Sequence, residues 1–224
     1  MMNNDEVKKV KKKRINLHKV YLLFVFLIFC GFIGTYAYRI YNDFFKKEPV
    51  EEIKEEKKLD EIKGYGYTLG ERDGELYKTN FESLNTILTA GEINYEEYAK
   101  TMTSMFIIDF YTLSTKMAST DVGGIEFLYP KGVDNFLINA QENMYKSVLS
   151  DFDGNRTQKL PTVKNVVIDS IAATKITYEK KKYDGYKIVA NWEYEEDLGY
   201  ESKGTFYVIN IENKLYMFSK TGSY

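Results

Sequence analysis

The sequence predicts an α+β protein. We expect an N-terminal transmembrane helix, then three helices packed on a curved antiparallel sheet of about four to five strands. Three observations lead to this fold class. Residues 20–38 carry no formally charged side chain. The chain after residue 63 first places apolar residues at the helical period, and later alternates apolar and polar residues as a strand does. Helices that cover one face of an antiparallel sheet form an α+β layout.

The N-terminal region predicts a membrane anchor. Residues 1–19 form a basic tail with seven cations, two acids and a net charge of +5. As a helix, residues 20–38 would span about 28 Å, close to the roughly 30 Å of bilayer hydrocarbon. Because basic segments stay in the cytoplasm, we expect the C-terminal part outside the plasma membrane. The alternative is a signal peptide whose cleavage would remove residues 1–37.

Residues 39–63 are predicted to form a charged stalk. Its main part, residues 46–63, holds seven acids and six lysines, which leaves too little apolar surface for a core. A semi-rigid helix held by charge pairs three residues apart fits this composition. A solvated tether without fixed structure fits it equally.

Residues 64–224 are predicted to form one extracytoplasmic domain that begins with two helices. Asp73 is expected to cap the first helix, which ends at Gly91. Asn94 is expected to cap the second helix, because a glutamate follows three residues later, and its apolar stripe reaches Met117. The middle of this helix is apolar on almost every side, so it should lie centrally in the domain.

A short strand is predicted at Ile125–Tyr129, followed by a third helix whose inner face runs from Val133 to Val148. The turn residues of Asp151–Asn155 then end the helical half. Lys180–Gly185 is predicted to be a polar turn within the sheet that follows. The four strands expected there are Val163–Tyr178, Tyr186–Tyr194, Tyr200–Ile209 and Lys214–Ser219. Short turns join antiparallel neighbours, so these strands should form a meander.

Composition excludes several kinds of site in this domain. The single Cys and the single His lie in the N-terminal region, so residues 64–224 contain neither. This excludes clustered His or Cys metal sites and His-dependent triads there. The domain holds 17 cations and 23 acids, and the net charge of −6 argues against nucleic-acid partners. Asp151–Asn155 begins like a calcium loop, but Arg156 and Thr162 replace the Gly and Glu that the loop requires. We therefore predict no cofactor and no metal.

Asp109 is the one candidate site residue, because it interrupts the apolar run Met105–Tyr111. A carboxylate in such surroundings must find a partner or take up a proton. It is a weak candidate for a catalytic acid–base residue on the floor of a pocket. The structural interpretation is a hydrogen bond or ion pair inside the fold. Catalysis needs a second positioned group, and the sequence nominates none, so we favour a protein that is not an enzyme.

The strand region is rich in aromatic residues, for which two interpretations stay open. They form either a core face turned to the helices or an exposed surface that binds a partner. The residues are Tyr186, Trp192, Tyr194, Tyr200 and Tyr207. We favour the core for the Tyr186–Tyr194 strand, whose aromatic residues share one face.

The element order of residues 64–224 resembles the cone-shaped nuclear-transport-factor-two-like fold, also called cystatin-like. With the anchor, the layout is similar to single-pass bridge proteins of type IV secretion and Gram-positive conjugation channels. The resemblance rests on element order, so no site residue is carried over. It implies an interaction or assembly domain in an envelope complex, with protein partners or a second copy of the chain. The alternative function is a small-ligand-binding or enzymatic cone that uses Asp109.

Overall fold

The structure, a computed structural model, describes residues 17–45 and 56–221. The chain divides into two units, residues 1–52 and residues 53–224. The basic tail up to residue 16 and the stalk residues 46–55 lie outside the described residues. The predictions made for those two segments therefore stay predictions.

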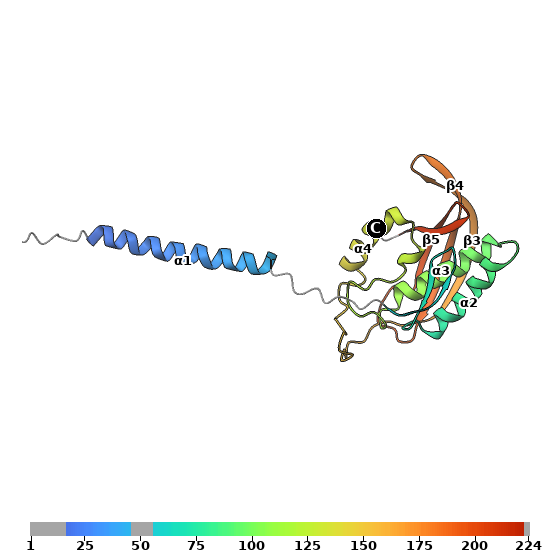
Figure 1. Cartoon of the computed structure of the whole chain (residues 1–224), viewed down its shortest axis with the longest axis horizontal. Helices are drawn as coiled ribbons and strands as arrows, with labels where there is room; N and C mark the ends of the chain where they lie inside the picture. Colours follow the sequence, from blue (N-terminus) through green and yellow to red (C-terminus); the bar gives the residue numbers. More distant parts are fainter. Residues whose placement is uncertain (1–16, 46–55, 222–224) are drawn as a thin grey trace, which may run out of the picture. The chain divides into compact units, whose positions relative to one another are not determined.

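In the described part of the first unit the chain forms one helix, α1, which runs over 29 residues from Leu17 to Phe45 (Figure 1). It includes the whole of the uncharged segment, residues 20–38, so the predicted helical conformation is confirmed. Within the described part of the chain, no helix combines the length and the apolar composition needed to cross a membrane.

The second unit has an α+β fold, as predicted. Its four-stranded antiparallel sheet follows the chain in the order β3-β4-β5-β6, and a separate antiparallel pair precedes the helices. Figure 1 shows α2 and α3 side by side over the sheet. The elements are β1 (Lys58–Ile62), β2 (Tyr67–Gly70), α2 (Glu75–Thr89), α3 (Tyr95–Tyr111), the 3-10 turns η1 (Ile125–Phe127) and η2 (Pro130–Gly132), α4 (Val133–Glu142), β3 (Val163–Tyr178), β4 (Lys181–Tyr194), β5 (Lys203–Ile211) and β6 (Lys214–Thr221).

The folded domain begins earlier than the predicted boundary at residue 64. Residues assigned to the stalk form β1, which pairs with β2. The prediction missed this strand because its first four residues, Lys58–Glu61, are all exposed and three of them are charged. Ile62 alone reaches the core, with 3% of its surface exposed.

Two helix boundaries differ from the predictions. Asp73 does not cap α2, because its carboxylate accepts a hydrogen bond from the Gly70 amide at 2.7 Å and Gly74 holds the cap position. Asn94 caps α3 as predicted, and its side-chain oxygen accepts from two amides of the first turn. However, α3 ends at Tyr111 rather than near residue 117. The Leu113 amide instead donates to the Pro161 carbonyl at 2.9 Å, which ties the chain to the segment before β3.

The strand predicted at Ile125–Tyr129 is wrong. Gly124, with φ of +78°, starts the 3-10 turn η1, and the Leu128 amide bonds back to the Ile125 carbonyl at 3.1 Å. These local bonds replace a strand ladder, and Leu128 makes one isolated parallel bridge to β6. Met217 is its partner in that bridge.

The third predicted helix is shorter than expected, because α4 ends at Glu142. Asn143 leaves the helical region with φ of −118° and ψ of −90°. After this turn, the Tyr145 side chain points into the core and is fully buried. Its hydroxyl donates to the Phe110 carbonyl at 2.8 Å.

The first two strands of the sheet form a longer hairpin than predicted. The polar segment expected to be a turn at residues 180–185 is part of β4 from Lys181 onward. Glu179 and Lys180 alone make the turn, with φ of +46° and +65°. Two consecutive residues with positive φ form the tight connection that matches the twist of an antiparallel pair. The hairpin therefore extends beyond β5, which pairs with β4 only from Gly185 to Asn191.

The core lies between α2, α3 and the sheet. The Phe106 ring of α3 meets Phe206 of β5 edge-on at 6.1 Å, and Tyr111 meets Trp192 of β4 at 4.4 Å. Trp192 is 2% exposed, and Tyr186, Tyr194 and Tyr200 pack against the core in partly buried positions. The interpretation of the β4 aromatic face as core is thus confirmed.

Candidate functional site

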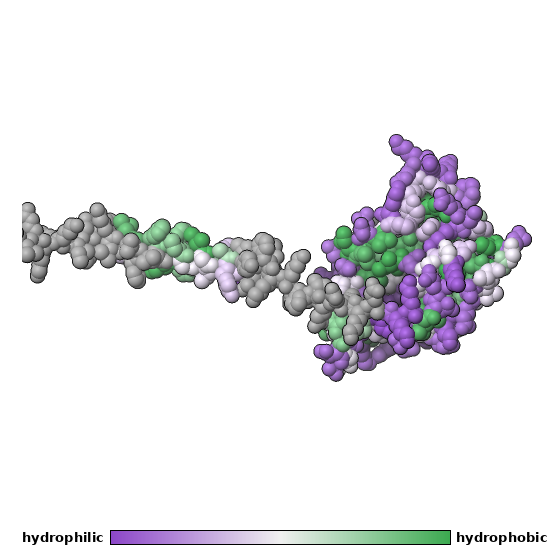
Figure 2. Space-filling model, viewed as in Figure 1, coloured by the Kyte–Doolittle hydropathy of each residue, from purple (hydrophilic) through white to green (hydrophobic). Residues whose placement is uncertain are grey.

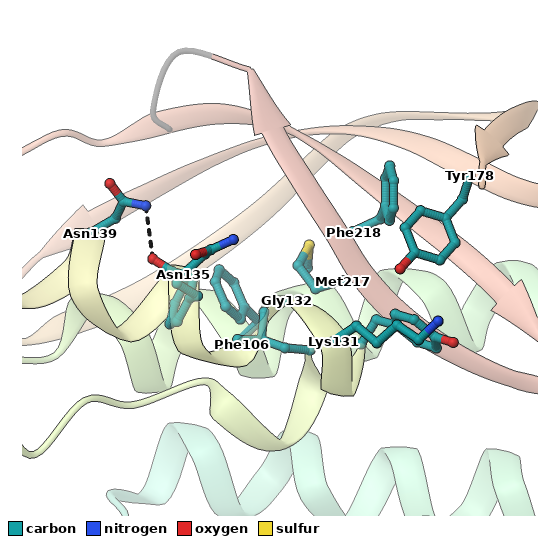
Figure 3. Close-up of a pocket in the computed structure, with 11 residues that line it drawn as sticks. Phe106, Lys131, Gly132, Asn135, Asn139, Tyr178, Met217 and Phe218 are labelled. Carbon is teal, nitrogen blue, oxygen red and sulfur yellow. Dashed lines mark hydrogen bonds between the residues drawn. The ribbon is translucent and has the colours of Figure 1, made fainter. Parts of the chain in front are cut away.

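A pocket of about 450 Å³ opens between α4 and the sheet (Figure 3). Its apolar wall includes Phe106 from α3, Phe136 from α4, and Met217 and Phe218 from β6. Pockets that bind ligands commonly have this size and a largely apolar lining. Figure 2 shows a hydrophobic area on this side of the domain, and the hydrophilic end of the β3–β4 hairpin projects beside it.

A set of aromatic contacts joins the pocket wall to the hairpin. The Tyr129 ring, just before η2, meets Tyr178 and Tyr216 edge-on, each at 5.4 Å between ring centres. Tyr178 also meets Phe218 edge-on at 5.5 Å. Such edge-to-face pairs contribute about 0.5–1.5 kcal/mol beyond the area that they bury. Because Tyr178 is the residue before the hairpin turn, these contacts fix the end of the hairpin relative to the pocket.

Polar groups of the pocket come from α4 and from the turn before it. Asn135 is exposed, and the Asn139 side-chain amide donates to the Asn135 carbonyl at 2.8 Å. Among the described lining residues, Lys131 carries the one formal charge. Its amino group pairs with the Glu179 carboxylate at 2.8 Å, and both side chains are more than half exposed. The pocket therefore combines an apolar wall with hydrogen-bonding amides and one cation.

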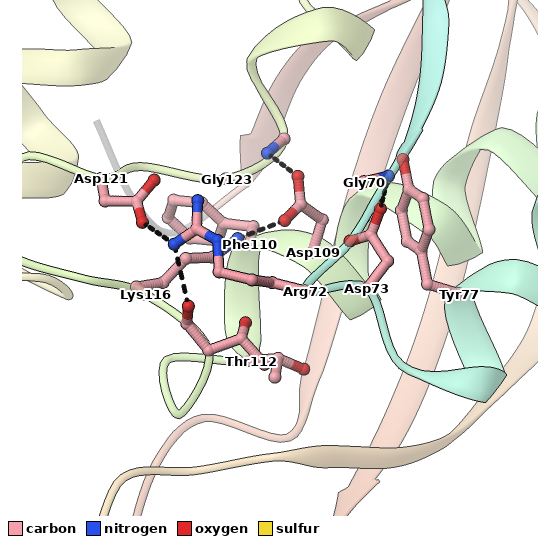
Figure 4. Close-up of polar contacts among 12 residues, drawn as sticks. Gly70, Arg72, Asp73, Tyr77, Asp109, Phe110, Thr112, Lys116, Asp121 and Gly123 are labelled. Carbon is pink, nitrogen blue, oxygen red and sulfur yellow. Dashed lines mark hydrogen bonds and ion pairs between the residues drawn. The ribbon is translucent and has the colours of Figure 1, made fainter. Parts of the chain in front are cut away.

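Asp109 lies in a different part of the domain, in an ion pair with Lys116 (Figure 4). One oxygen of Asp109 accepts from the Lys116 amino group, and the other accepts from the Gly124 amide. Lys116 is 9% exposed. Burial disfavours its charge, but the adjacent Asp109 more than offsets this and raises the pKa of Lys116 above its usual value. The carboxylate thus holds the residues after α3 against the helix end.

Two further ion pairs, both made by Arg72, adjoin the first. The Arg72 guanidinium contacts the Asp121 carboxylate at 2.6 Å and the Glu56 carboxylate at 3.0 Å. It also donates to the Thr115 carbonyl at 3.1 Å, and the Met117 amide donates to Asp121 at 2.8 Å. These bonds connect the β1–β2 hairpin with the long loop that follows α3. We call this group, together with Asp109 and Lys116, the polar network.

Two further carboxyl groups near the polar network hold their protons more tightly than usual. Burial raises the pKa of Asp73 to about 6, although a hydrogen bond from Gly70 opposes the change. Burial likewise raises the pKa of Glu126 to about 7, against hydrogen bonds from Thr68 and Tyr77. Perturbed carboxyl groups of this kind occur both in functional sites and in structural networks.

The structure does not bring Asp109 to the pocket, because Asp109 is not among the residues that line it. Its acid–base role therefore stays a prediction, and the partners found for it are those of a structural ion pair. Among the described residues, no group of three His, Cys, Asp or Glu side chains could hold a metal ion.

No residue that lines the pocket was predicted from the sequence to belong to a functional site. The wall is made by residues of α3, α4 and β6 that are 112 positions apart at the extremes, from Phe106 to Phe218. One signal was available, because the last residue of β3, Tyr178, is aromatic. Aromatic residues at strand ends extend beyond the helices that cover a sheet, and they can line an opening there.

Comparison with known proteins gives no match. No family model, no curated protein and no solved structure matches this chain. The function must therefore be inferred from the pocket and its surroundings.

Proposed function

We propose that the second unit is a protein-interaction domain that assists assembly of an envelope complex, and that its pocket receives an apolar segment of a partner protein. The single observation that carries this proposal is the aromatic pocket beside α4. Aromatic residues and methionine are enriched at protein interfaces, and large exposed apolar areas commonly mark such sites.

The charged groups of the domain support a binding role rather than a catalytic one. The acids around Asp109 are engaged in bonds to Lys116, Arg72 and backbone amides. The pocket itself offers amides and a cation at 59% exposure, Lys131, rather than an acid and a base within reach of one another. Such a lining suits hydrogen bonding and apolar contact with a bound segment.

We also propose that the N-terminal segment holds this domain on the outer face of the plasma membrane. The support comes from the sequence, in which the uncharged residues 20–38 follow a tail of net charge +5. Such a tail stays in the cytoplasm, so the domain would face outward as part of a single-pass protein. The resemblance in element order to bridge proteins of secretion and conjugation channels is consistent with this arrangement.

The pocket proposal is tested by photo-crosslinking in intact cells. A photoreactive phenylalanine analogue replaces Asn135, which is exposed and lines the pocket, or Lys146, which is exposed and lies outside the lining. We expect one discrete protein adduct from position 135 and none from position 146. An adduct at twice the chain mass of 26.2 kDa would identify a second copy as the occupant. Equal yields at both positions, or none at position 135, would contradict the proposal.

The membrane proposal is tested by extraction and proteolysis. We expect the full chain to stay in the membrane pellet at alkaline pH and to be released by detergent. Protease added to cells whose cell wall has been removed should digest the second unit and leave residues 1–19 protected. Release at alkaline pH without detergent would show that the segment does not span the bilayer, and a mature chain starting near residue 38 would show cleavage.

A further inference from the structure

The end of the β3–β4 hairpin differs in charge from the rest of the domain. Residues 175–187 hold five lysines and two acids, whereas residues 64–224 as a whole have a net charge of −6. A positive segment on an acidic domain is a local feature of the electrostatic field that attracts anions. It lies directly beside the pocket, because Tyr178 belongs to both.

Both acids of this hairpin end already have cationic partners. Asp184 pairs with Lys175 across the two strands, and Glu179 pairs with Lys131 at the rim of the pocket. The three consecutive lysines at positions 180–182 are exposed and add their charge to this balanced surface. The surface beside the pocket is therefore positive after its internal ion pairs are counted.

The backbone of the turn holds these lysines in place. Glu179 and Lys180 both have positive φ, a conformation that residues other than Gly, Asn and Asp seldom adopt. Two such residues in succession form the tight turn that joins twisted antiparallel strands, as Glu212 and Asn213 do between β5 and β6. The Lys131–Glu179 pair and the rings that meet Tyr178 add contacts between this turn and the pocket. The lysines are thus presented at a defined place relative to the pocket.

We propose that the pocket and the lysines at positions 180–182 together bind an acidic segment of a partner protein that carries an aromatic side chain. This inference rests on the proposed function and specifies the chemistry of the partner. The aromatic side chain enters the pocket between Phe136 and Phe218. The carboxylates of the same segment lie along the hairpin end, where Lys181 is paired with Tyr178 across the strands and so shares its face, with Lys180 and Lys182 on either side in the chain.

Charge complementarity, and the fact that different elements carry the two features, favour a polypeptide as the occupant. The apolar wall belongs to α3, α4 and β6, whereas the lysines stand on the projecting hairpin. A ligand that reaches both must therefore carry several anionic groups along an extended chain. An acidic peptide has this form, since successive residues of an extended chain advance by about 3.3 Å. Complementary charges of this kind mainly accelerate association and select the partner.

The test is a fluorescence titration of the full chain in nanodiscs of neutral lipid. The probe is a labelled peptide of alternating Asp and Gly residues around one central Trp. Two matched peptides serve as controls, one with Ala in place of Trp and one with Lys in place of every Asp. We expect binding of the first peptide alone, and its dissociation constant should rise about tenfold or more between low and physiological salt.

Charge reversal of the hairpin end then isolates the electrostatic part. Replacing Lys180, Lys181 and Lys182 together by Glu should weaken binding of the acidic peptide by about 100-fold. The matched control reverses three exposed cations outside the pocket lining and the hairpin, with the same change in net charge. These are Lys78, Lys146 and Lys203. Equal weakening by both triple variants would show a general charge effect and would overturn the proposal.

A pocket variant separates this proposal from the function on which it rests. A Cβ atom added at Gly132, which lines the pocket, would meet no other atom within 4 Å, and the same is true at Gly91 outside it. Gly132→Trp should abolish binding of the acidic Trp peptide, whereas Gly91→Trp should leave it unchanged. If the Lys-containing Trp peptide binds equally well and is also blocked by Gly132→Trp, the pocket function stands and the acidic preference is wrong. If neither peptide depends on Gly132, the pocket function itself fails.

Anionic lipid is the remaining occupant that the experiment distinguishes. Vesicles that contain phosphatidylglycerol are added as a competitor in place of the unlabelled peptide. We expect the unlabelled peptide to displace the probe and the vesicles to leave it bound. Displacement by vesicles at lower concentration than by peptide would assign the surface to lipid head groups and would contradict the proposal.

Discussion

The polar network and the pocket use polar and apolar side chains in opposite ways. In the polar network, the buried Lys116 and the partly buried Asp109 satisfy one another, so the charges hold the chain together. In the pocket, rings such as Tyr178 and Phe218 are packed on one side and line an open volume on the other. A charged group whose partners lie within the fold stabilises the fold. An apolar wall that no side chain of the domain covers can instead bind a partner.

This difference explains why the most conspicuous residue of the sequence is not the basis of the proposed function. Asp109 stands out because it is an acid in an apolar run, and the fold supplies a lysine for it seven residues later. The pocket residues are ordinary aromatic and aliphatic residues until the fold places them around one volume.

Removing the cation of the polar network should have the largest effect on stability. Lys116→Met leaves the Asp109 carboxylate without its charged partner in a largely buried position. We expect the free energy of unfolding to fall by about 3 kcal/mol, measured by urea unfolding of the full chain in non-ionic detergent. The double variant Lys116→Met with Asp109→Asn should recover part of the loss. A loss below about 0.5 kcal/mol for the single variant would show that the pair is not structural.

The close approach of the loop to α3 should make Gly123 sensitive to any side chain. An added Cβ atom would lie 2.5 Å from the Asp109 carbonyl oxygen and 2.5 Å from its carboxylate. Gly123→Ala should therefore destabilise the domain by about 1–3 kcal/mol through forced displacement of the loop. Gly91→Ala, where the added atom meets open space, is the matched control and should change stability by less than about 0.5 kcal/mol. Equal stability of the two variants would contradict the observed packing.

The raised pKa values near the polar network predict how stability depends on pH. The pKa of Glu126 rises from its ordinary 4.5 to about 7 in the folded domain, and that of Asp73 rises from 3.8 to about 6. The folded state then binds more protons than the unfolded state over this interval. Stability should therefore be highest below about pH 4 to 5 with respect to these groups, and should fall as the pH rises toward 7.

Glu126→Gln checks this assignment, because an amide can accept similar hydrogen bonds without a charge. We expect the loss of stability between pH 5 and pH 8 to shrink by about 1–2 kcal/mol in this variant. The control is Glu142→Gln on the exposed end of α4, which should leave the pH dependence as it is. If the pH dependence of stability is identical in all three proteins, Glu126 is not the group whose protonation causes it.

The smallest effect on stability is expected at the pocket. The Cβ atom of Gly132→Trp would meet no other atom within 4 Å and its ring can extend into the pocket, so the free energy of unfolding should change by less than about 0.5 kcal/mol. Thermal unfolding of the full chain measures this directly. A large loss would mean that the pocket closes around residues of the fold and is not available to a partner.

The sequence predicted the regular parts of the fold well where one periodicity dominates. The Asn94 cap, the strand β3 over residues 163–178 and the core face of β4 follow from local rules alone. The errors occur where tertiary contacts override those rules. At the end of α3, the Leu113 amide bonds to the Pro161 carbonyl and the helix stops. After Gly124, residues 125–127 form a 3-10 turn where a strand was expected.

The site could be predicted only in part, because the contacting residues are close in sequence in the polar network and far apart in sequence in the pocket. The partner of Asp109 is close in sequence, so an ion pair was among the expected outcomes. The pocket depends on Phe106, Phe136 and Phe218 meeting across the fold, and no local pattern reports such a meeting. The turn at Glu179 was missed for a related reason, since neither of its residues is one that favours positive φ.

The most direct test of the pocket as a docking site is the effect of filling it on partner capture in cells. The photoreactive residue at position 135 is combined with Gly132→Trp or with Gly91→Trp, and the adduct yield is measured relative to the amount of chain. We predict that Gly132→Trp removes the adduct and that Gly91→Trp leaves its yield unchanged. An undiminished adduct with Gly132→Trp, at normal stability of the domain, would contradict the account.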